Sequence, residues 1–348
     1  MKTTFVSSIS LSQAHRQTIG EAQQDLLRAQ KELASGRHHD LGLELGYDVG
    51  RAVSIRGELN RIDTFISTNQ SASTRLEVTE NALSGLVQGA EDFLAALLAT
   101  KQGSERGTAV EAAKAAMASA EELLRSSVGG DYVFSGINAS VPPVESYYAN
   151  PTSLSKQQID AEFLGVFGVA QTNVAVSGIT GAQMQSFLDN EFAAEFNTAN
   201  WAANWSQASD QNMTSRISYS TVVETSVSAN DSSIRALMQA YTMVADLGGD
   251  GLNQEAYAVV ADAAISKIGE AIFGLNDLRT SVGIASERVQ NATDRASLQK
   301  DVFTTDLQEL EAVDPYEVSA RINELTSQLE TSYALTGRLQ RLSLLNFL

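Results

Sequence analysis

Apolar residues recur in alternating steps of three and four positions through long stretches of both halves of the chain. In the series from Leu59 to Leu97, nine of twelve positions are apolar, and the register does not slip. In a second series, from Tyr257 to Val313, fifteen of seventeen positions are apolar. A spacing of 3.5 residues sustained over this length is typical of helices that pack along a coiled-coil seam. The pattern therefore predicts two long helices that pack on each other as part of a bundle.

Glycine and proline mark where the helices are expected to end. Two shorter series, at 110–124 and 234–244, stop at Gly129-Gly130 and at Gly248-Gly249 respectively. The longest series halts just before Pro315, and we expect this proline to open a further helix because proline is tolerated in a first turn. Each half of the chain is therefore predicted to hold a terminal helix, one long helix and one shorter helix.

The two chain ends carry seams of their own. The N-terminal seam stops at Ser35-Gly36, and the C-terminal seam shifts register around Ser332-Tyr333 before it resumes. The last seven residues, LSLLNFL, are unusually apolar and would promote aggregation if they stayed exposed. Because a lone helix pair buries one stripe on each helix and isolated helices of this length are marginal, we expect neighbouring subunits to cover the remaining apolar surface. The predicted assembly interface comprises Ile19, Ala22, Leu26, Ala29, Leu33, Ile322, Leu325, Leu329, Leu335, Leu339, Leu342, Leu345, Phe347 and Leu348.

The middle of the chain, residues 137–229, has a different composition. It holds three of the four prolines and both tryptophans. The segment that begins at Ile217 is β-branched and partly alternating and is predicted to be strand, and the segment from Asp160 is a second candidate strand. The segment from Met184 is predicted to be helix. We therefore expect a mainly α fold, in which both chain ends build a long helical coiled-coil rod and the inserted domain is α+β or mainly β.

The order of these parts predicts three domains. Residues 1–40 with 314–348 would form a terminal coiled-coil assembly domain, and residues 41–136 with 230–313 a helical rod domain. Residues 137–229 would form the inserted domain. The first two domains each combine segments from both chain ends, so the order of parts along the chain is mirror-like.

The charge balance excludes several classes of partner. The chain carries 24 Lys and Arg against 42 Asp and Glu, a formal net charge of −18, without a basic cluster. A nucleic-acid binder needs basic side chains that displace counterions, and an anionic membrane surface repels an acidic chain. The longest apolar run, Phe93–Ala99, is far shorter than the about 20 residues that a membrane span needs. We therefore expect no nucleic-acid partner and no membrane insertion.

Few residues offer chemistry for catalysis or for metal binding. The chain has no cysteine, and it contains neither a Gly-rich phosphate loop nor a G-x-S-x-G elbow. His38-His39-Asp40 has metal-ligand chemistry, but adjacent residues seldom converge on one ion. Asp246, Asp250 and Asn253 do not follow the spacing of an EF-hand loop and are expected at a turn between helices. We therefore predict no enzyme, no catalytic residue, no cofactor and no metal site.

Three short motifs resemble segments of the flagellin superfamily. Glu32–Arg37, ELASGR, resembles the L-x-S-G-K/R segment that closes the first helix, and Gly130–Gly136, GDYVFSG, resembles the G-x-Y-V/L-F-S/A-G segment. The chain end, Leu342–Leu348, is similar to that of the hook-filament junction members, whereas flagellins usually end in a more Gln/Ala-rich stretch. The resemblance covers about 1–136 and 217–348. The stretch HHDLGLELGYDVGRAV departs from the Pro-Ser-Asp-Asp-Pro-like segment common in the family, which leaves the shape of that loop open.

The resemblance implies a structural subunit of the bacterial flagellum, which forms the junction between hook and filament and templates flagellin assembly through its terminal helices. The implied partners are the preceding hook-associated protein, flagellin and copies of the same chain in a ring, and an export chaperone is a further candidate. The protein would be extracellular, exported through the flagellar secretion channel without a cleaved signal peptide, with the insert facing outward. Two alternatives stay open: flagellin itself, and a secreted coiled-coil needle-tip or translocator-like module.

Overall fold

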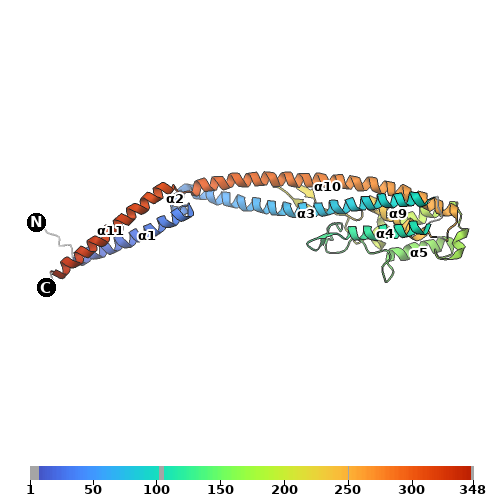
Figure 1. Cartoon of the computed structure of the whole chain (residues 1–348), viewed down its shortest axis with the longest axis horizontal. Helices are drawn as coiled ribbons and strands as arrows, with labels where there is room; N and C mark the ends of the chain where they lie inside the picture. The colour runs from blue at the N-terminus through green and yellow to red at the C-terminus, as the bar shows by residue number, and fades with distance from the viewer. Residues whose placement is uncertain (1–7, 102–105, 250, 346–348) are drawn as a thin grey trace. The chain divides into compact units, whose positions relative to one another are not determined.

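Long helices dominate the structure. The computed structural model describes residues 8–101, 106–249 and 251–345, and the longest helices are built from the two outer parts of the chain (Figure 1). The predicted mainly α fold, with a helical rod formed from both chain ends, is therefore confirmed.

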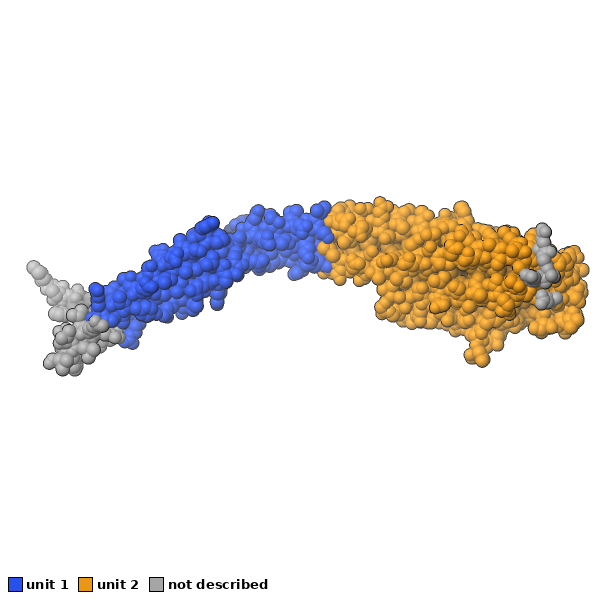
Figure 2. All heavy atoms as spheres, viewed as in Figure 1, with its two compact units in different colours: residues 1–63, 297–348 blue, residues 64–296 orange. Residues whose placement is uncertain are grey.

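The chain divides into two compact units, shown in different colours in Figure 2. Unit 1 comprises residues 1–63 and 297–348, and unit 2 comprises residues 64–296. Helix α3, Val49–Thr100, and helix α10, Gln254–Glu311, contribute residues to both units. The three predicted domains follow other boundaries and stay a prediction.

In unit 1, helix α1, Ser8–Ser35, lies alongside helix α11, Pro315–Leu345 (Figure 1). The amide of Gln23 donates a hydrogen bond across this pair to the hydroxyl of Tyr333, with Nε2 and OH 2.5 Å apart. Helix α11 opens at Pro315 as predicted, and it continues without interruption through the register shift around Ser332. The two terminal seams thus form one helix pair.

A short connection joins α1 to α3 within unit 1. The chain leaves α1 at Gly36, whose φ of +68° lies in the left-handed region that favours glycine. Helix α2, Leu41–Leu45, follows, and its N-terminus is capped by Asp40, which accepts a hydrogen bond from the Leu43 amide at 3.1 Å. A 3₁₀ turn, η1, Gly46–Asp48, leads into α3. The segment that departs from the family pattern is therefore helical for most of its length.

Helices α3 and α10 run antiparallel, because the residue number of the partner on α10 falls as the number on α3 rises. In unit 1, Lys300 pairs with Asp63 at 2.8 Å, and in unit 2 Arg279 pairs with Glu80 at 2.8 Å. Every position of the first apolar series is buried or partly buried, and so is every position of the second except Gln299. The predicted packing of these two series on each other is confirmed.

Unit 2 adds two shorter helices to α3 and α10. Helix α4, Arg106–Leu124, packs on helix α9, Ser232–Leu247. Met117 and Tyr241 have at most 1% of their surface exposed. Both helices belong to the hydrophobic core that also takes in residues from the insert.

Helices are the main regular structure of the insert, and the prediction of a strand from Asp160 is wrong. Residues around Asp160 form α5, which starts at a serine cap: Ser153 Oγ accepts a hydrogen bond from the Lys156 amide at 3.2 Å. Ile159 and Phe163, four positions apart, are fully buried, which is the spacing of one helix face. The helical elements of the insert are α5, Leu154–Phe167; η2, Val174–Gly178; α6, Gly181–Phe187; η3, a π-helix, Leu188–Phe192; α7, Ala193–Glu195; and α8, Thr198–Asn204. The predicted helix from Met184 is confirmed, since α6, η3 and α7 follow one another directly and α8 begins after its cap residue, Asn197.

Two small antiparallel sheets occur among the described residues. One pairs β1, Ser127–Val128, with β2, Asp131–Tyr132, and the other pairs β3, Thr214–Arg216, with β4, Val222–Glu224. The strand predicted from Ile217 therefore forms only in its middle, at β4. Of these strands only β3 and β4 lie in the insert, which therefore fits the α+β alternative and not the mainly β one. Past β2, Gly136 cannot be replaced without strain, because a Cβ would lie 2.5 Å from the Gln211 carbonyl oxygen.

By length and composition alone, one described helical stretch, Leu41–Thr100, is apolar enough to cross a membrane. Its apolar side chains include Leu83, Ala90, Phe93 and Leu97, which are at most 3% exposed and belong to the core of unit 2. The core helix of a protein folded in water passes the same test, so this is weak support for a membrane span. The absence of membrane insertion stays a prediction.

Candidate assembly surface

The α1/α11 pair brings together the described residues of the predicted assembly interface. Ala22, Ala29 and Leu329 are buried between the helices, at 7%, 1% and 7% exposure. Leu33 and Leu335 stay exposed, at 42% and 45%. The half-buried members are Ile19, Leu26, Ile322 and Leu325. The predicted set therefore divides into residues that are buried in the helix pair and residues that the pair leaves exposed, and their part in an assembly interface stays a prediction.

The C-terminal members of the predicted set lie at the end of α11 or beyond it. Leu339, Leu342 and Leu345 belong to its last turns, and Phe347 and Leu348 lie outside the described residues. Their part in an interface stays a prediction.

Large apolar side chains that the seams do not include are also exposed on this pair. Leu27 on α1 is 58% exposed, and Tyr316 and Tyr333 on α11 are 87% and 51% exposed. None of these three residues falls on the three-and-four spacing of the terminal seams, so the sequence pattern did not predict them as interface residues. Together with Leu33 and Leu335, they make five large apolar side chains that the helix pair leaves exposed, and we call these five residues the terminal surface. Large exposed apolar side chains offer area that a neighbouring subunit could cover.

A buried carboxylate holds the connection between the terminal pair and α3. Glu311, at the end of α10, is fully buried, and its Oε1 lies 2.6 Å from Arg56 Nη2 of α3. Its other oxygen lies 3.4 Å from Arg37 Nη1, which belongs to the connection after α1. The backbone adds two hydrogen bonds, from the His38 amide to the Glu311 carbonyl at 3.0 Å and from the Val313 amide to the Gly36 carbonyl at 3.1 Å. Removing one partner of a buried ion pair is costly, so this cluster fixes the connection.

A second buried carboxylate, on α1, also contacts the connection between α1 and α3. Glu32 is 6% exposed, and its Oε1 accepts a hydrogen bond from the His39 amide at 3.0 Å. Its Oε2 lies 3.6 Å from Arg321 Nη1 of α11. His38 and His39 thus contribute their backbone amides here. Among the described residues, no three His, Asp or Glu side chains lie close enough together to hold a metal ion.

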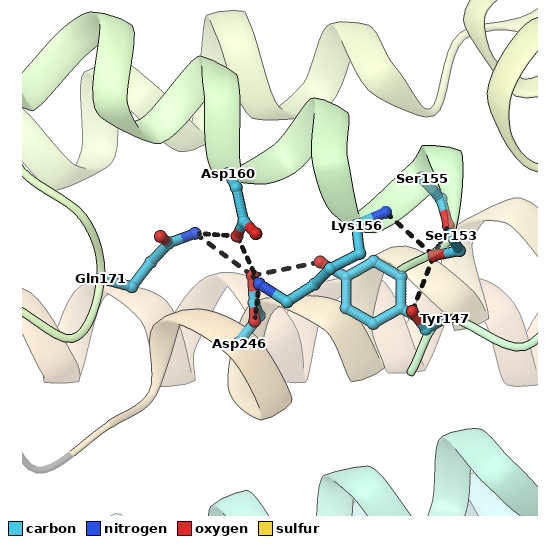
Figure 3. Close-up of polar contacts among 7 residues, drawn as sticks. All are labelled: Tyr147, Ser153, Ser155, Lys156, Asp160, Gln171 and Asp246. Carbon is cyan, nitrogen blue, oxygen red and sulfur yellow. Dashed lines mark hydrogen bonds and ion pairs between the residues drawn. The ribbon is translucent and has the colours of Figure 1, made fainter. Parts of the chain in front are cut away.

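A polar cluster inside unit 2 ties the insert to α9 (Figure 3). The Asp246 carboxylate accepts hydrogen bonds from the Tyr147 hydroxyl at 3.1 Å and from Gln171 Nε2 at 3.3 Å, and it lies 3.1 Å from Lys156 Nζ. Lys156 also pairs with Asp160. Burial raises the pKa of Asp246, although the charge of Lys156 opposes that rise. Three separate segments of the insert are therefore held by one side chain near the end of α9.

This cluster has residue types that could suggest a nucleophile, but its geometry does not support one. Ser153 and Lys156 have the S-x-x-K spacing of some serine enzymes. The Ser153 hydroxyl instead donates to the Tyr147 carbonyl oxygen at 2.7 Å, and the Lys156 amine faces the two carboxylates (Figure 3). The lysine is thus occupied as a cation and does not serve as a base for the serine. We interpret the cluster as a structural contact.

Near that cluster, the turn predicted between helices is present. It connects α9 to α10, and Asn253 caps α10 by accepting a hydrogen bond from the Ala256 amide at 2.9 Å. Asp246 does not lie in the turn but on the last full turn of α9, where it points into the polar cluster. Asp250 lies outside the described residues.

We predict that Glu121→Gln makes unit 2 more stable at neutral pH. Burial raises the pKa of Glu121, while the Tyr147 amide, which donates to Oε1 at 2.8 Å, and Ser146 lower it. A carboxyl whose pKa is raised by folding contributes stability below its ordinary pKa, and this contribution is lost as the pH rises through the folded-state pKa. Each unit of elevation corresponds to about 1.4 kcal/mol. Glutamine keeps the acceptor for Tyr147 without the buried charge.

Urea denaturation at pH 7 and at pH 4 measures this effect. The variant's advantage should be present at pH 7 and should shrink at pH 4, where the wild-type carboxyl takes up its proton. Glu122→Gln, at the exposed neighbouring position, is the matched control and should change little at either pH. A variant that is less stable than the wild type at pH 7 would contradict the argument.

Long helices from both chain ends, paired with each other, define the class of this protein as a mainly helical structural subunit. Two family models bear this out. The model described as the bacterial flagellin N-terminal helical region matches residues 6–139, and the model described as the bacterial flagellin C-terminal helical region matches residues 265–348. The chain belongs to the flagellin superfamily. Proteins of this family are structural components of the bacterial flagellum, an extracellular appendage, and are not enzymes.

A solved structure from Vibrio parahaemolyticus has a similar fold. That protein is described provisionally as a flagellar hook-associated protein, and the two structures agree with a TM-score of 0.51. The sequences are 10% identical over 76% of this chain and 97% of that chain. At this identity the likeness concerns the fold alone. No curated protein matches the sequence.

Proposed function

We propose that this protein is a subunit of the junction between the flagellar hook and the filament. The observation that carries the proposal is the terminal surface, where five large apolar side chains on α1 and α11 are 42% to 87% exposed. At roughly 25 cal/mol for each Å² of apolar area removed from water, covering these side chains favours assembly. The resemblance of Leu342–Leu348 to the corresponding segment of junction members favours the junction over the filament. A protein described as hook-associated has a similar fold.

The same proposal assigns the partners. The preceding hook-associated protein would lie on one side and flagellin on the other, with copies of this chain side by side in a ring. An export chaperone would cover the apolar terminal segments before export through the flagellar secretion channel. Part of the terminal surface would be covered only in the assembled flagellum, so assembly would further stabilise the folded α1/α11 pair.

Deletion of the gene tests the junction role. We expect cells with intact hooks and no attached filaments, because flagellin would have no template. Complementation with the full chain should restore the filaments, and the chain should appear in sheared flagella as a minor band. Normal motility in the deletion strain would refute the proposal.

The alternative, flagellin, makes the opposite prediction for self-assembly. A filament subunit polymerises onto seeds of its own kind, whereas a junction subunit does not continue to add copies. Purified chain mixed with filament seeds at moderate salt should therefore give no long homopolymer by light scattering. Extensive polymer would favour the flagellin alternative.

A further inference from the structure

Met213 differs from the other methionines that the structure describes. It directly precedes β3, is partly exposed, and lines a groove of about 410 Å³ beside α3. The other four are at most 2% exposed, which shields their sulfur atoms from small oxidants: Met117, Met184, Met238 and Met243. A thioether must be within reach of an oxidant to become a sulfoxide. Among the described residues, Met213 is therefore the methionine that a dissolved peroxide can attack.

The Met213 sulfur faces a cation that is itself largely buried. The Arg75 side chain of α3 is 13% exposed, and its Nη1 lies 2.8 Å from Met213 Sδ. Its Nη2 lies 3.2 Å from Asp131 Oδ2 of β2. The backbone of Met213 belongs to the β3/β4 hairpin, because its carbonyl accepts a hydrogen bond from the Thr225 amide at 2.8 Å. One guanidinium therefore joins α3 to both small sheets.

Oxidation of this sulfur is incompatible with its contact to Arg75. A hydrogen bond from an N–H group to an oxygen alone takes about 2.9 Å between the heavy atoms. An oxygen bonded to Met213 Sδ therefore does not fit between Sδ and Arg75 Nη1, which are 2.8 Å apart. If the oxygen points elsewhere, the sulfur becomes the positive end of the S–O dipole and repels the guanidinium. In either orientation, the two side chains must separate.

We propose that Met213 is an oxidation site, at which a peroxide converts the thioether to a sulfoxide and releases the β3/β4 hairpin from Arg75. A sulfur lone pair attacks one oxygen of hydrogen peroxide, and the S–O bond forms as the O–O bond breaks. The proton on the transferred oxygen passes to the leaving oxygen, which departs as water. The thioether thus loses two electrons and the peroxide gains them. The flagellum is an extracellular appendage, so peroxide from the surroundings reaches it directly.

The release is local, because a second contact holds the same hairpin on α3. Asn69 of α3 is fully buried, and its Nδ2 donates a hydrogen bond to the Ile217 carbonyl at 3.2 Å. Neither an amide nor a carbonyl reacts with dilute peroxide. The oxidised hairpin should therefore stay on α3 at Ile217, while β3 and its partner residues in β4 loosen.

Mass spectrometry and amide hydrogen exchange on the purified full chain test this proposal. In dilute hydrogen peroxide, Met213 should gain one oxygen roughly tenfold faster than buried Met117, the internal control. In the chain oxidised at Met213, exchange in the peptide 213–226 should rise about fivefold, while exchange in α9 stays unchanged. Treatment with methionine sulfoxide reductases, which act on the two sulfoxide epimers, should restore the slow exchange.

Two substitutions assign the effect to one sulfur atom. In Met213→Leu, which has no sulfur at this position, peroxide should leave exchange in 213–226 unchanged. Met117→Leu is the matched control and should keep the peroxide effect. Equal oxidation rates at Met213 and Met117, unchanged exchange after oxidation, or the same peroxide effect in Met213→Leu would each overturn the proposal. Because the purified chain suffices, the outcome does not depend on the proposed junction role.

Discussion

Replacing Ala29 by aspartate is expected to separate α1 from α11 and to exclude the protein from assembled flagella. Ala29 is 1% exposed and packs in a small cluster with Val313, Val318 and Ile322. A carboxylate at this position would be buried without a partner, which costs several kcal/mol. Because the cluster is small, we expect its packing to contribute less free energy than burial of the carboxylate costs, so that α1 and α11 separate.

Two measurements follow the Ala29→Asp variant. The purified chain should lose helical signal in far-UV circular dichroism, and the amount of chain in sheared flagella should fall at least tenfold. Ala34→Asp is the matched control, because Ala34 lies on the same helix and is exposed. If Ala29→Asp incorporates as well as the control does, the α1/α11 pair is not needed for assembly.

Replacing Trp201 by alanine is expected to destabilise unit 2 by about 3–5 kcal/mol. Trp201 is fully buried, stacks on Trp205 with ring centroids 5.4 Å apart, and donates a hydrogen bond from Nε1 to Asn230 Oδ1 at 3.1 Å. The substitution leaves a cavity and an Asn230 without its donor. Because the aromatic contacts continue through Phe196, the loss should extend to the neighbouring helices of the insert.

Urea denaturation followed by circular dichroism measures this loss. Trp201→Phe should recover part of the stability, since it keeps much of the buried ring but not the hydrogen bond. Val174→Ala is the control for a change at an exposed site of the insert. A Trp201→Ala variant within 1 kcal/mol of the wild type would show that the insert does not depend on this side chain.

The helices could be predicted from the sequence because a 3.5-residue spacing leaves little choice of structure. Glycine and proline have special backbone preferences, and they marked two helix boundaries correctly: α1 ends just before Gly36, and α11 begins at Pro315. The segment from Asp160, predicted to be a strand and found to be a helix, shows the limit of prediction from local spacing. Its apolar neighbours fit a strand as well as a helix when taken locally. The contact of Ile159 and Phe163 with the core, which decides between the two, depends on distant parts of the chain.

The spacing of apolar residues predicted only part of the candidate site. Ala22, Ala29 and Leu329, which the seam places in the predicted assembly interface, are buried in the structure, and their part in assembly stays a prediction. The spacing alone does not distinguish these buried residues from Leu33 and Leu335, which stay exposed. Burial depends on which side chains of the partner helix lie opposite, and the spacing does not show this. Glu311 carries no signal at all: it is one of many acidic residues, and its burial follows from a connection whose path the sequence did not show.

Both tryptophans of the chain lie in the insert, stacked nearly parallel at an interplanar angle of 10°. Intrinsic fluorescence excited at the indole band therefore reports on unit 2 alone, and unit 1 has no tryptophan to contribute. Two indoles at this separation also couple optically and should give a paired band in the near-ultraviolet circular dichroism. The native chain thus carries a built-in optical probe, with which the insert can be followed separately from the terminal helices without any label.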